Sequence, residues 1–438
     1  MKTMKVLAAS VAALAMTANA FGQAAPAPAP MSAAALLPET QAVLEGYVTS
    51  GKLPGIVAAI GVGDFPTGFL SAGKISDEAN APAAGPDTLW RVYSMTKPVT
   101  AMAAMILIEE GKLGLDEPIS KYLPAFAKMR VLTSPATSLD SVPAKTAITI
   151  RHLLTHTAGL GYNIINPTQP LAKEYERLGL LPGATNADTE VKARTIRPAT
   201  LAAFADKLAT APLIAEPGTK WSYSVGLDLM GAVIEQASGM SFDAFLKARL
   251  FDPLKMTSTY FTVPAGDAAR LSTNYVFVAG KRVPFDPGAT SLWLTPPSFP
   301  YGGAGLVSSA RDYDRFLHML QNGGSLDGVQ VMKPATVALA MSNLLPAGVV
   351  FGGIGGVTGG TSTPNQGFGA GGSVYLVDMP NGPGKGTYGW GGAAGTVAYV
   401  DPTRKLRGTI MVQYFPADQY SIRTEVPAAL AKDLARFR

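Results

Sequence analysis

The chain of 438 residues carries a formal net charge of +5 at neutral pH, is 47% hydrophobic and contains no cysteine. This length suits one large domain, or two interlocked ones, and the absence of cysteine excludes disulfides and a lipid-modified N-terminal cysteine. The basic residues are scattered, and the densest group, Arg404, Lys405 and Arg407, is expected to form a solvated turn between strands, which argues against nucleic-acid binding.

The first 20 residues have the features of a secretory signal peptide. Lys2 and Lys5 precede an apolar stretch at 6–16, and small residues at 18–20 form a cleavage site near Ala20. The apolar stretch is too short to span a bilayer, so no stable membrane anchor is expected after cleavage. Residues 21–32, rich in alternating Ala and Pro, are expected to be a stiff linker. We therefore expect a periplasmic or secreted bacterial protein.

The remaining chain shows strand patterns at both ends and helical patterns between them. After a helix at 33–49, strands are expected at 55–61 and 68–74, and again at 372–378, 396–400 and 406–414, before a closing helix at 424–437. The clearest helical segments between these strands lie at 118–123, 150–155, 200–208, 227–237 and 242–250. This order predicts an α/β (α+β) fold, in which a sheet domain at 33–115 and 291–438 is interrupted by a mostly helical insert at 116–290.

A candidate nucleophile stands at the start of an apolar segment. Residues 99–108 carry no charge, which is typical of a helix that is buried on every side. Ser94 occupies the expected N-cap position, and Lys97, three residues later, lies on the same face of the first turn. Burial favours the neutral form of a lysine, which would make Lys97 a base toward the Ser94 hydroxyl.

Two other short motifs receive less weight. A second Ser-x-x-Lys, at Ser71 and Lys74, lies in a strand that runs into a turn, with no helix after it. A Gly-x-Gly-x-x-Gly match at 367–372 precedes a strand, whereas a dinucleotide-binding motif follows a strand and opens a helix. Context therefore favours Ser94.

Histidine is scarce, which limits the catalytic mechanisms that the chain could use. His152 and His156 are expected on one helix, but the glutamate of a His-Glu-x-x-His zinc site is missing, and a metal site is not expected. His318 is expected on an amphipathic helix, and the sequence contains no Gly-x-Ser-x-Gly. A hydrolase with this sequence would use a base other than histidine.

Two further stretches carry candidate site residues. Tyr223 lies in a loop that opens into a helix, where it would point into a cleft or cap the core. The second stretch includes Trp390, Gly391, Gly392 and Ala393. Its glycine density would let backbone N–H groups approach a ligand, as an oxyanion hole requires, or would mark a crowded edge strand.

Taken in order, three motifs resemble those of the family VIII carboxylesterases, which belong to the superfamily of penicillin-binding proteins and class C β-lactamases. The motifs are Ser94-Met-Thr-Lys97, Tyr223-Ser-Val225 and Trp390-Gly-Gly392, and the stretches 153–160, 253–258 and 302–312 also match. The resemblance covers nearly the whole chain from residue 33 onward. It implies a serine β-lactamase-like fold, with an antiparallel sheet flanked by helices and a mostly helical inserted domain.

The same resemblance implies a role for each site residue. Ser94 would be the nucleophile, Lys97 its proton acceptor and Tyr223 the group that passes a proton to the leaving group. Ala393, directly after the third motif, would supply an oxyanion N–H beside that of Ser94. No metal or organic cofactor is implied.

Two departures from class C β-lactamases bear on the substrate. Trp390 replaces the lysine of the third motif, and Val225 replaces an asparagine. Losing a cation and an amide should weaken binding of an anionic lactam, and an aromatic wall suits an uncharged acyl group. Hydrolysis of a small carboxylic ester is therefore the first expectation. The alternatives are β-lactam or D-amino-acid peptide hydrolysis and a non-catalytic, penicillin-binding-like recognition module.

Overall fold

The computed structural model describes residues 32–437, except 166, 182, 184, 354–364 and 381. The expected signal peptide and all but the last residue of the expected linker lie outside the described residues. Within the described part of the chain, no helix is both long and apolar enough to cross a membrane.

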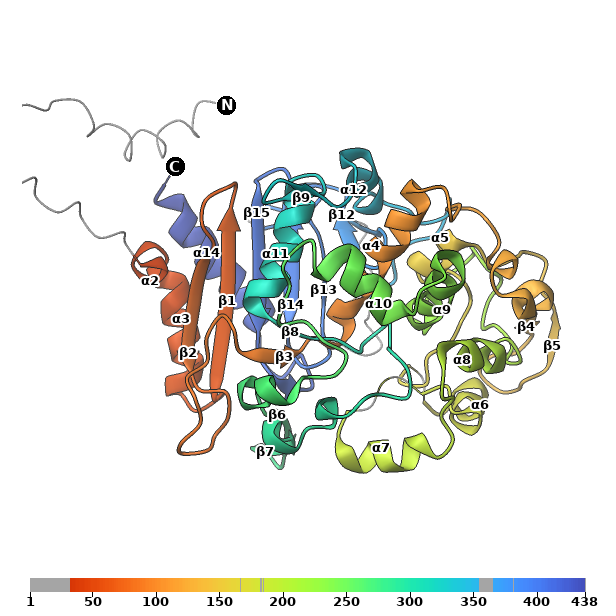
Figure 1. The fold of residues 1–438 in the computed structure, drawn as a ribbon, viewed down its shortest axis with the longest axis horizontal. Coiled ribbons are helices and arrows are strands. Elements are labelled where there is room, and N and C mark those ends of the chain that lie inside the picture. Colours follow the sequence, from red (N-terminus) through yellow and green to blue (C-terminus); the bar gives the residue numbers. More distant parts are fainter. Residues whose placement is uncertain are drawn as a thin grey trace, which may run out of the picture.

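A seven-stranded antiparallel sheet joins the two ends of the chain (Figure 1). Its strands, in spatial order, are β11 (Gln366–Phe368), β12 (Ser373–Tyr375), β13 (Tyr388–Gly391), β14 (Val397–Asp401), β15 (Leu406–Met411), β1 (Gly55–Val62) and β2 (Gly68–Gly73). β1 is buried at every position but its last. Ile56 and Ala58 pack into the core on one face of the sheet, whereas Val57 and Ala59 pack into the core on the other. A strand buried on both faces explains its unbroken apolar sequence.

Helices from the two termini cover one face of this sheet. They are α2 (Ala33–Leu36), α3 (Pro38–Thr49) and α14 (Ile422–Ala435). The Thr40 N–H and hydroxyl both donate to the Asp433 carboxylate at 2.8 Å, and Glu39 accepts from Arg436 at 2.8 Å. These contacts tie the first long helix of the described chain to the last.

The opposite face is covered by α11 (Ala310–Gln321) and α4 (Thr96–Glu109). All residues of α4 from Thr96 to Leu107 are buried, which confirms the expected apolar central helix. Smaller elements lie around these layers: β3 (Leu89–Arg91), β8 (Val307–Ser309), β9 (Ser325–Leu326), β10 (Val329–Gln330), α12 (Pro334–Ala340) and β16 (Tyr414–Phe415).

The middle of the chain is mostly helical, as expected. Its helices are α5 (Ile150–Leu154), α6 (Pro170–Leu178), α7 (Ala187–Arg194), α8 (Leu201–Leu208), α9 (Gly226–Ser238) and α10 (Phe242–Leu246), which a π-helical turn continues over Lys247–Phe251. It also contains two hairpins, β4 (Arg130–Leu132) with β5 (Ser141–Pro143) and β6 (Asn274–Val278) with β7 (Lys281–Asp286). α9 packs directly against α4. The domain boundaries stay a prediction.

Three expectations need correction. The helix expected at 118–123 is a single 3₁₀ turn, Ile119–Lys121, and a second turn, Pro124–Lys128, follows it. Further 3₁₀ turns cover Ala265–Arg270, Gly288–Thr290 and Leu292–Leu294. The glycine-rich stretch at 388–391 forms a strand, β13, but it lies between β12 and β14 inside the sheet and is not an edge strand. Arg407 is not part of a solvated turn: it is fully buried in β15, where its Nε donates to Asp314 of α11 at 2.8 Å.

Candidate active site

Ser94 lies at the junction of β3 and α4. It belongs to a 3₁₀ turn, Tyr93–Met95, and the N-cap of α4 is Met95, so the expected N-cap role of Ser94 is wrong. Tyr93 has a φ of 43°, in the left-handed region, which costs a non-glycine residue about 1–3 kcal/mol unless its surroundings hold it there. This turn continues into α4 and places the Ser94 side chain on the same side as Lys97.

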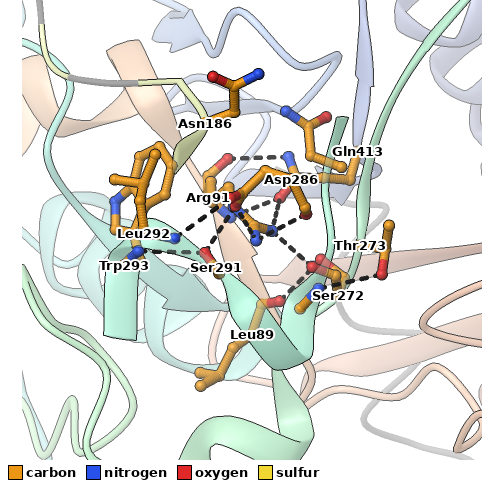
Figure 2. Close-up of polar contacts among 12 residues, drawn as sticks. Leu89, Arg91, Asn186, Ser272, Thr273, Asp286, Ser291, Leu292, Trp293 and Gln413 are labelled. Atoms are coloured by element: carbon orange, nitrogen blue, oxygen red, sulfur yellow. Dashed lines mark hydrogen bonds and ion pairs between the residues drawn. The ribbon is translucent and has the colours of Figure 1, made fainter. Parts of the chain in front are cut away.

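A buried polar network holds the strand that leads into this turn. Arg91 is fully buried and forms an ion pair with Asp286, to which its Nε donates at 2.7 Å (Figure 2). The Gln413 side chain pairs with the Arg91 backbone: its Oε1 accepts from the Arg91 N–H at 2.8 Å and its Nε2 donates to the Arg91 carbonyl at 3.2 Å. The Trp293 ring packs edge-on against Tyr93. Strand β3 is therefore fixed from three distant segments of the chain.

Lys97 is fully buried, with its amino group directed at Ser94. Lys97 Nζ donates to Ser94 Oγ at 3.2 Å and to the Gly303 carbonyl at 2.7 Å. The same nitrogen lies 4.5 Å from the centroid of the Tyr223 ring and 5.7 Å from that of Tyr162. Within the described chain, Lys97 forms no ion pair. Two aromatic rings, the Gly303 carbonyl and the Ser94 hydroxyl thus lie around this amine.

Asp228 is a site residue that the sequence analysis missed. It lies in the first turn of α9, is buried, and accepts a hydrogen bond from the Gly303 N–H at 2.8 Å. Desolvation raises the pKa of Asp228, and the charge of Lys97 opposes that rise. The available signal was a lone carboxylate in an otherwise apolar helical segment, Leu227-Asp228-Leu229-Met230.

Tyr223 completes the hydrogen bonds around Ser94. Its phenol donates to Ser94 Oγ at 2.7 Å, and Trp390 Nε1 donates to the phenol oxygen at 3.4 Å. The Trp390 ring packs against Tyr223, Phe351 and Phe368. The structure thus brings together one residue from each of the three motifs.

A glycine of the third motif packs against the segment that leads to Ser94. After β13 the chain turns back into β14, and Gly392 N–H closes this turn on the Thr396 carbonyl at 2.8 Å. A Cβ on Gly392 would lie 2.4 Å from the carbonyl oxygen of Val92, two residues before Ser94. Only glycine allows this approach, which brings the turn containing Ala393 against the segment of Ser94.

The second Ser-x-x-Lys motif is remote from this site. Ser71 lies in β2, the edge strand at the opposite end of the sheet from β11, and pairs with Val57. Lys74 Nζ donates to the carbonyl of Ala79 at 2.8 Å. The 367–372 glycine motif forms the β11–β12 hairpin and opens no helix.

The two neighbouring histidines do not share a helix, contrary to expectation. His152 belongs to α5 and its Nδ1 accepts from the Thr149 N–H at the N-cap, whereas His156 follows the helix with a φ of 55°. His156 is fully buried against the Tyr223 ring, and its Nδ1 lies 2.9 Å from Ser224 Oγ. Burial lowers the pKa of His156 well below its usual value, and the charge of Lys97 adds to this effect. His318 lies on the amphipathic helix α11, as expected.

Comparison with known proteins identifies the family. The Beta-lactamase family model matches residues 40–432, nearly the whole described chain. The chain belongs to the β-lactamase family. This confirms the resemblance and the fold class, and the protein is a serine hydrolase of that family.

Relatives of this β-lactamase-family protein include esterases. Esterase EstB of Burkholderia gladioli is 32% identical over 391 residues, covering 85% of this chain and 88% of that protein. The structure of EstCE1, described as a hydrolase with promiscuous acyltransferase activity, superimposes with a TM-score of 0.73 at 28% identity over 90% of this chain and 98% of that one. Simvastatin synthase LovD of Aspergillus terreus, at 24% identity, shares the fold, with a TM-score of 0.73 over 92% of this chain and 99% of that one. The roles of the individual site residues stay predictions.

Proposed function

We propose that this β-lactamase-family protein hydrolyses carboxylic esters through an acyl-enzyme on Ser94. The observation that carries the proposal is the position of Ser94 Oγ, which is held between Lys97 Nζ at 3.2 Å and the Tyr223 phenol at 2.7 Å. A serine hydroxyl becomes a nucleophile when a neighbouring group accepts its proton, and Lys97, the proposed acceptor, is within hydrogen-bonding distance.

The proposed reaction has two halves. Ser94 Oγ attacks the ester carbonyl while its proton passes to the Lys97 amine, and the carbonyl oxygen becomes an oxyanion that accepts hydrogen bonds from the Ser94 and Ala393 N–H groups. Tyr223 then gives a proton to the departing alcohol, which leaves Ser94 acylated. Water attacks the acyl group in the second half and loses a proton to the Tyr223 phenolate, while Lys97 returns its proton to Ser94 Oγ and the acid is released.

An uncharged substrate fits the third motif better than an anionic lactam. The Trp390 indole, packed against Tyr223 and Phe368, stands where class C β-lactamases have a lysine. Val225 is buried at the N-cap of α9, and its N–H donates to the Gly161 carbonyl at 3.2 Å. An indole face and an isopropyl group offer no charged donor to a carboxylate, and the named activities of EstB and EstCE1 agree with ester hydrolysis.

Active-site substitutions test this proposal. Ser94→Ala should lower kcat for p-nitrophenyl esters by several orders of magnitude, because the nucleophile is lost, while Ser71→Ala should stay within a few-fold of the wild type. A fluorophosphonate should label the wild type at Ser94, as read by mass spectrometry of the modified peptide. A folded Ser94→Ala variant with full activity would refute the proposal. A wild type that neither turns over esters nor reacts with the probe would support the recognition module instead.

We also propose that the protein is exported from the cytoplasm. It is supported by the basic, apolar and small-residue regions of the first 20 residues. Expression of the full chain in a Gram-negative host, followed by fractionation and N-terminal sequencing, should find a protein cleaved near Ala20 outside the cytoplasm. An uncleaved cytoplasmic product would contradict export without affecting the proposed chemistry.

A further inference from the structure

Arg423, in the first turn of α14, contacts both ends of the turn that follows the third motif. Its Nη2 donates to the Gly392 carbonyl at 2.5 Å and to the Thr396 carbonyl at 2.9 Å. Two backbone hydrogen bonds close the turn: the Gly392 N–H donates to the Thr396 carbonyl, and the Gly395 N–H donates to the Gly392 carbonyl. One guanidinium nitrogen therefore fixes the two carbonyls between which Ala393 lies.

The guanidinium also packs closely against Gly391, the last residue of β13. A Cβ on Gly391 would lie 2.9 Å from Arg423 Nη2 and 3.0 Å from its Cζ. Since Gly392 is in similarly close contact with the Val92 carbonyl, the turn is held between Arg423 and the segment that leads to Ser94. The two adjacent glycines of the third motif thus have different partners, and Arg423 is the partner of Gly391.

The positive charge of Arg423 lies in unfavourable surroundings. Among the residues that the structure describes, no carboxylate forms an ion pair with it, and its Nε is buried without a hydrogen-bond partner. The charged or titratable groups that act on it are Tyr414, Asp418 and Tyr223, and burial lowers its pKa. A cation in the first turn of a helix also opposes the helix dipole. Buried cations are normally paired, so these costs need a compensating interaction.

We infer that Arg423 is a positioning residue for the oxyanion hole: it holds the Gly392–Thr396 turn so that the Ala393 N–H faces the reacting carbonyl. Its unpaired positive charge also favours the negative charge that develops on the carbonyl oxygen during acyl transfer. The inference rests on the proposed function and adds a residue from the C-terminal helix to its machinery.

Substitution of Arg423 tests the inference through the split between kcat and KM. Arg423→Met removes the hydrogen bonds and the charge but keeps much of the side-chain volume. Since loss of one oxyanion-hole donor costs about 10²–10³ in kcat, we expect kcat for a p-nitrophenyl ester to fall by about a hundredfold, with KM changed only a few-fold. The matched control is Arg436→Met at the other end of α14, whose side chain pairs with Glu39 and should leave kcat unchanged.

Chemical rescue separates a role in the reaction from a role in folding. In Arg423→Ala, added guanidinium at concentrations below those that denature the protein should restore part of kcat, while methylammonium, which lacks the planar group that packs against Gly391, should not. Arg423→Lys keeps a charge without the planar group that packs against Gly391 and should lose about tenfold in kcat. If Arg423→Met does not fold, the Lys variant and the rescue of the Ala variant decide the question.

Two results would overturn the inference. One is a folded Arg423→Met or Arg423→Lys enzyme with kcat within threefold of the wild type, and the other is a loss that lies only in KM or in the thermal melt, without guanidinium rescue. Either result, combined with an inactive Ser94→Ala variant, leaves the proposed function intact. A fully active Ser94→Ala variant would instead remove the proposed function itself.

Discussion

Asp228 and Lys97 hold Gly303 by its two backbone groups: the carboxylate accepts from the Gly303 N–H at 2.8 Å, and the amine donates to the Gly303 carbonyl at 2.7 Å. A Cβ on Gly303 would lie 2.6 Å from Asp228 Oδ2, so only glycine fits between them. Asp228 therefore acts on Lys97 in two ways, through the backbone that it positions and through its charge.

Substitution of Asp228 should separate these two effects. Asp228→Asn keeps an oxygen acceptor for the Gly303 N–H but removes the charge that compensates Lys97 after it takes up a proton, and we expect kcat to fall about tenfold, equivalent to about 1.4 kcal/mol. Asp228→Ala should lose more, because a buried N–H is then left without a partner. Ester kinetics and thermal melts of both variants provide the measurement. Two folded variants with wild-type kcat would show that Asp228 is only structural.

Lys97 should be irreplaceable by a permanent cation. Lys97→Ala removes the proton acceptor and should be nearly inactive, and Lys97→Arg should not restore activity because an arginine stays protonated. Burst kinetics with a p-nitrophenyl ester would measure the acylation step directly. Rapid acylation of the Arg variant would show that the residue acts through its charge rather than as a base.

Trp390→Lys should shift the substrate preference. It places a cation where a lactam carboxylate would bind, and a charge-assisted hydrogen bond contributes roughly 1.5–3 kcal/mol, so binding improves by about ten- to a hundredfold if the geometry allows. Ester turnover should fall at the same time because the aromatic wall against Tyr223 is lost. The measured quantity is the ratio of kcat/KM for nitrocefin to that for a short-chain ester, which should rise. A wild type that hydrolyses nitrocefin as fast as any ester would refute the proposed order of substrates.

His156 should make the fold sensitive to acid without taking part in acylation. Burial lowers its pKa in the folded protein, whereas an unfolded histidine titrates near about 6.5. Its stabilising contribution is therefore complete above that unfolded value and is lost as the pH falls toward the lower folded pKa, by up to about 1.4 kcal/mol per pH unit.

His156→Gln removes this titration while leaving the other groups in place. Urea unfolding at pH 7, 6 and 5 should show a smaller loss of unfolding free energy in the variant than in the wild type. Folded variant should still acylate, as should folded His152→Gln. Loss of acylation in a well-folded variant of either histidine would favour a histidine-based mechanism.

Substituting only one member of the Arg91–Asp286 ion pair should lower the stability of the fold strongly. Arg91→Met leaves a buried carboxylate without its cation, and such changes cost about 3–5 kcal/mol. The double variant Arg91→Met/Asp286→Leu should be more stable than the sum of the two single changes predicts, because neither charge is then left unpaired. Unfolding free energies from urea titrations measure this coupling. Additive effects would show that the two side chains contribute independently.

The elements that could be predicted from the sequence are those with strong local patterns. The unbroken apolar sequences of β1 and α4 place both elements to within a few residues, and the closing helix is displaced by two residues at its start. Predictions from the local sequence were wrong where contacts with distant parts of the chain determine the backbone conformation. Ser94 follows a residue with positive φ that the Arg91, Trp293 and Gln413 contacts support, so the helix begins after it rather than at it.

In the candidate site, too, some residues could be predicted from local motifs and others could not. Ser94, Lys97 and Tyr223 stand in recognisable motifs, and the structure places Lys97 and Tyr223 within hydrogen-bonding distance of Ser94. Gly303 is 206 residues from the lysine that it contacts, and Arg423 contacts the third motif from another element, so neither pairing leaves a local signal. The prediction for Arg407 was wrong for the same reason. A basic residue in a polar stretch was expected at the surface, but Arg407 is buried and donates a hydrogen bond to Asp314 of α11.

The pairing of α3 with α14 has a practical consequence for handling the enzyme. α14 begins at the third-motif turn and runs for 14 residues, about 21 Å, before Arg436 reaches Glu39. The last described residues therefore lie a full helix length from Arg423 and beside the start of the described chain, as Figure 1 shows. A tag or a tether to a solid support at the C-terminus should leave substrate access free, and the immobilised enzyme should keep the KM of the free one.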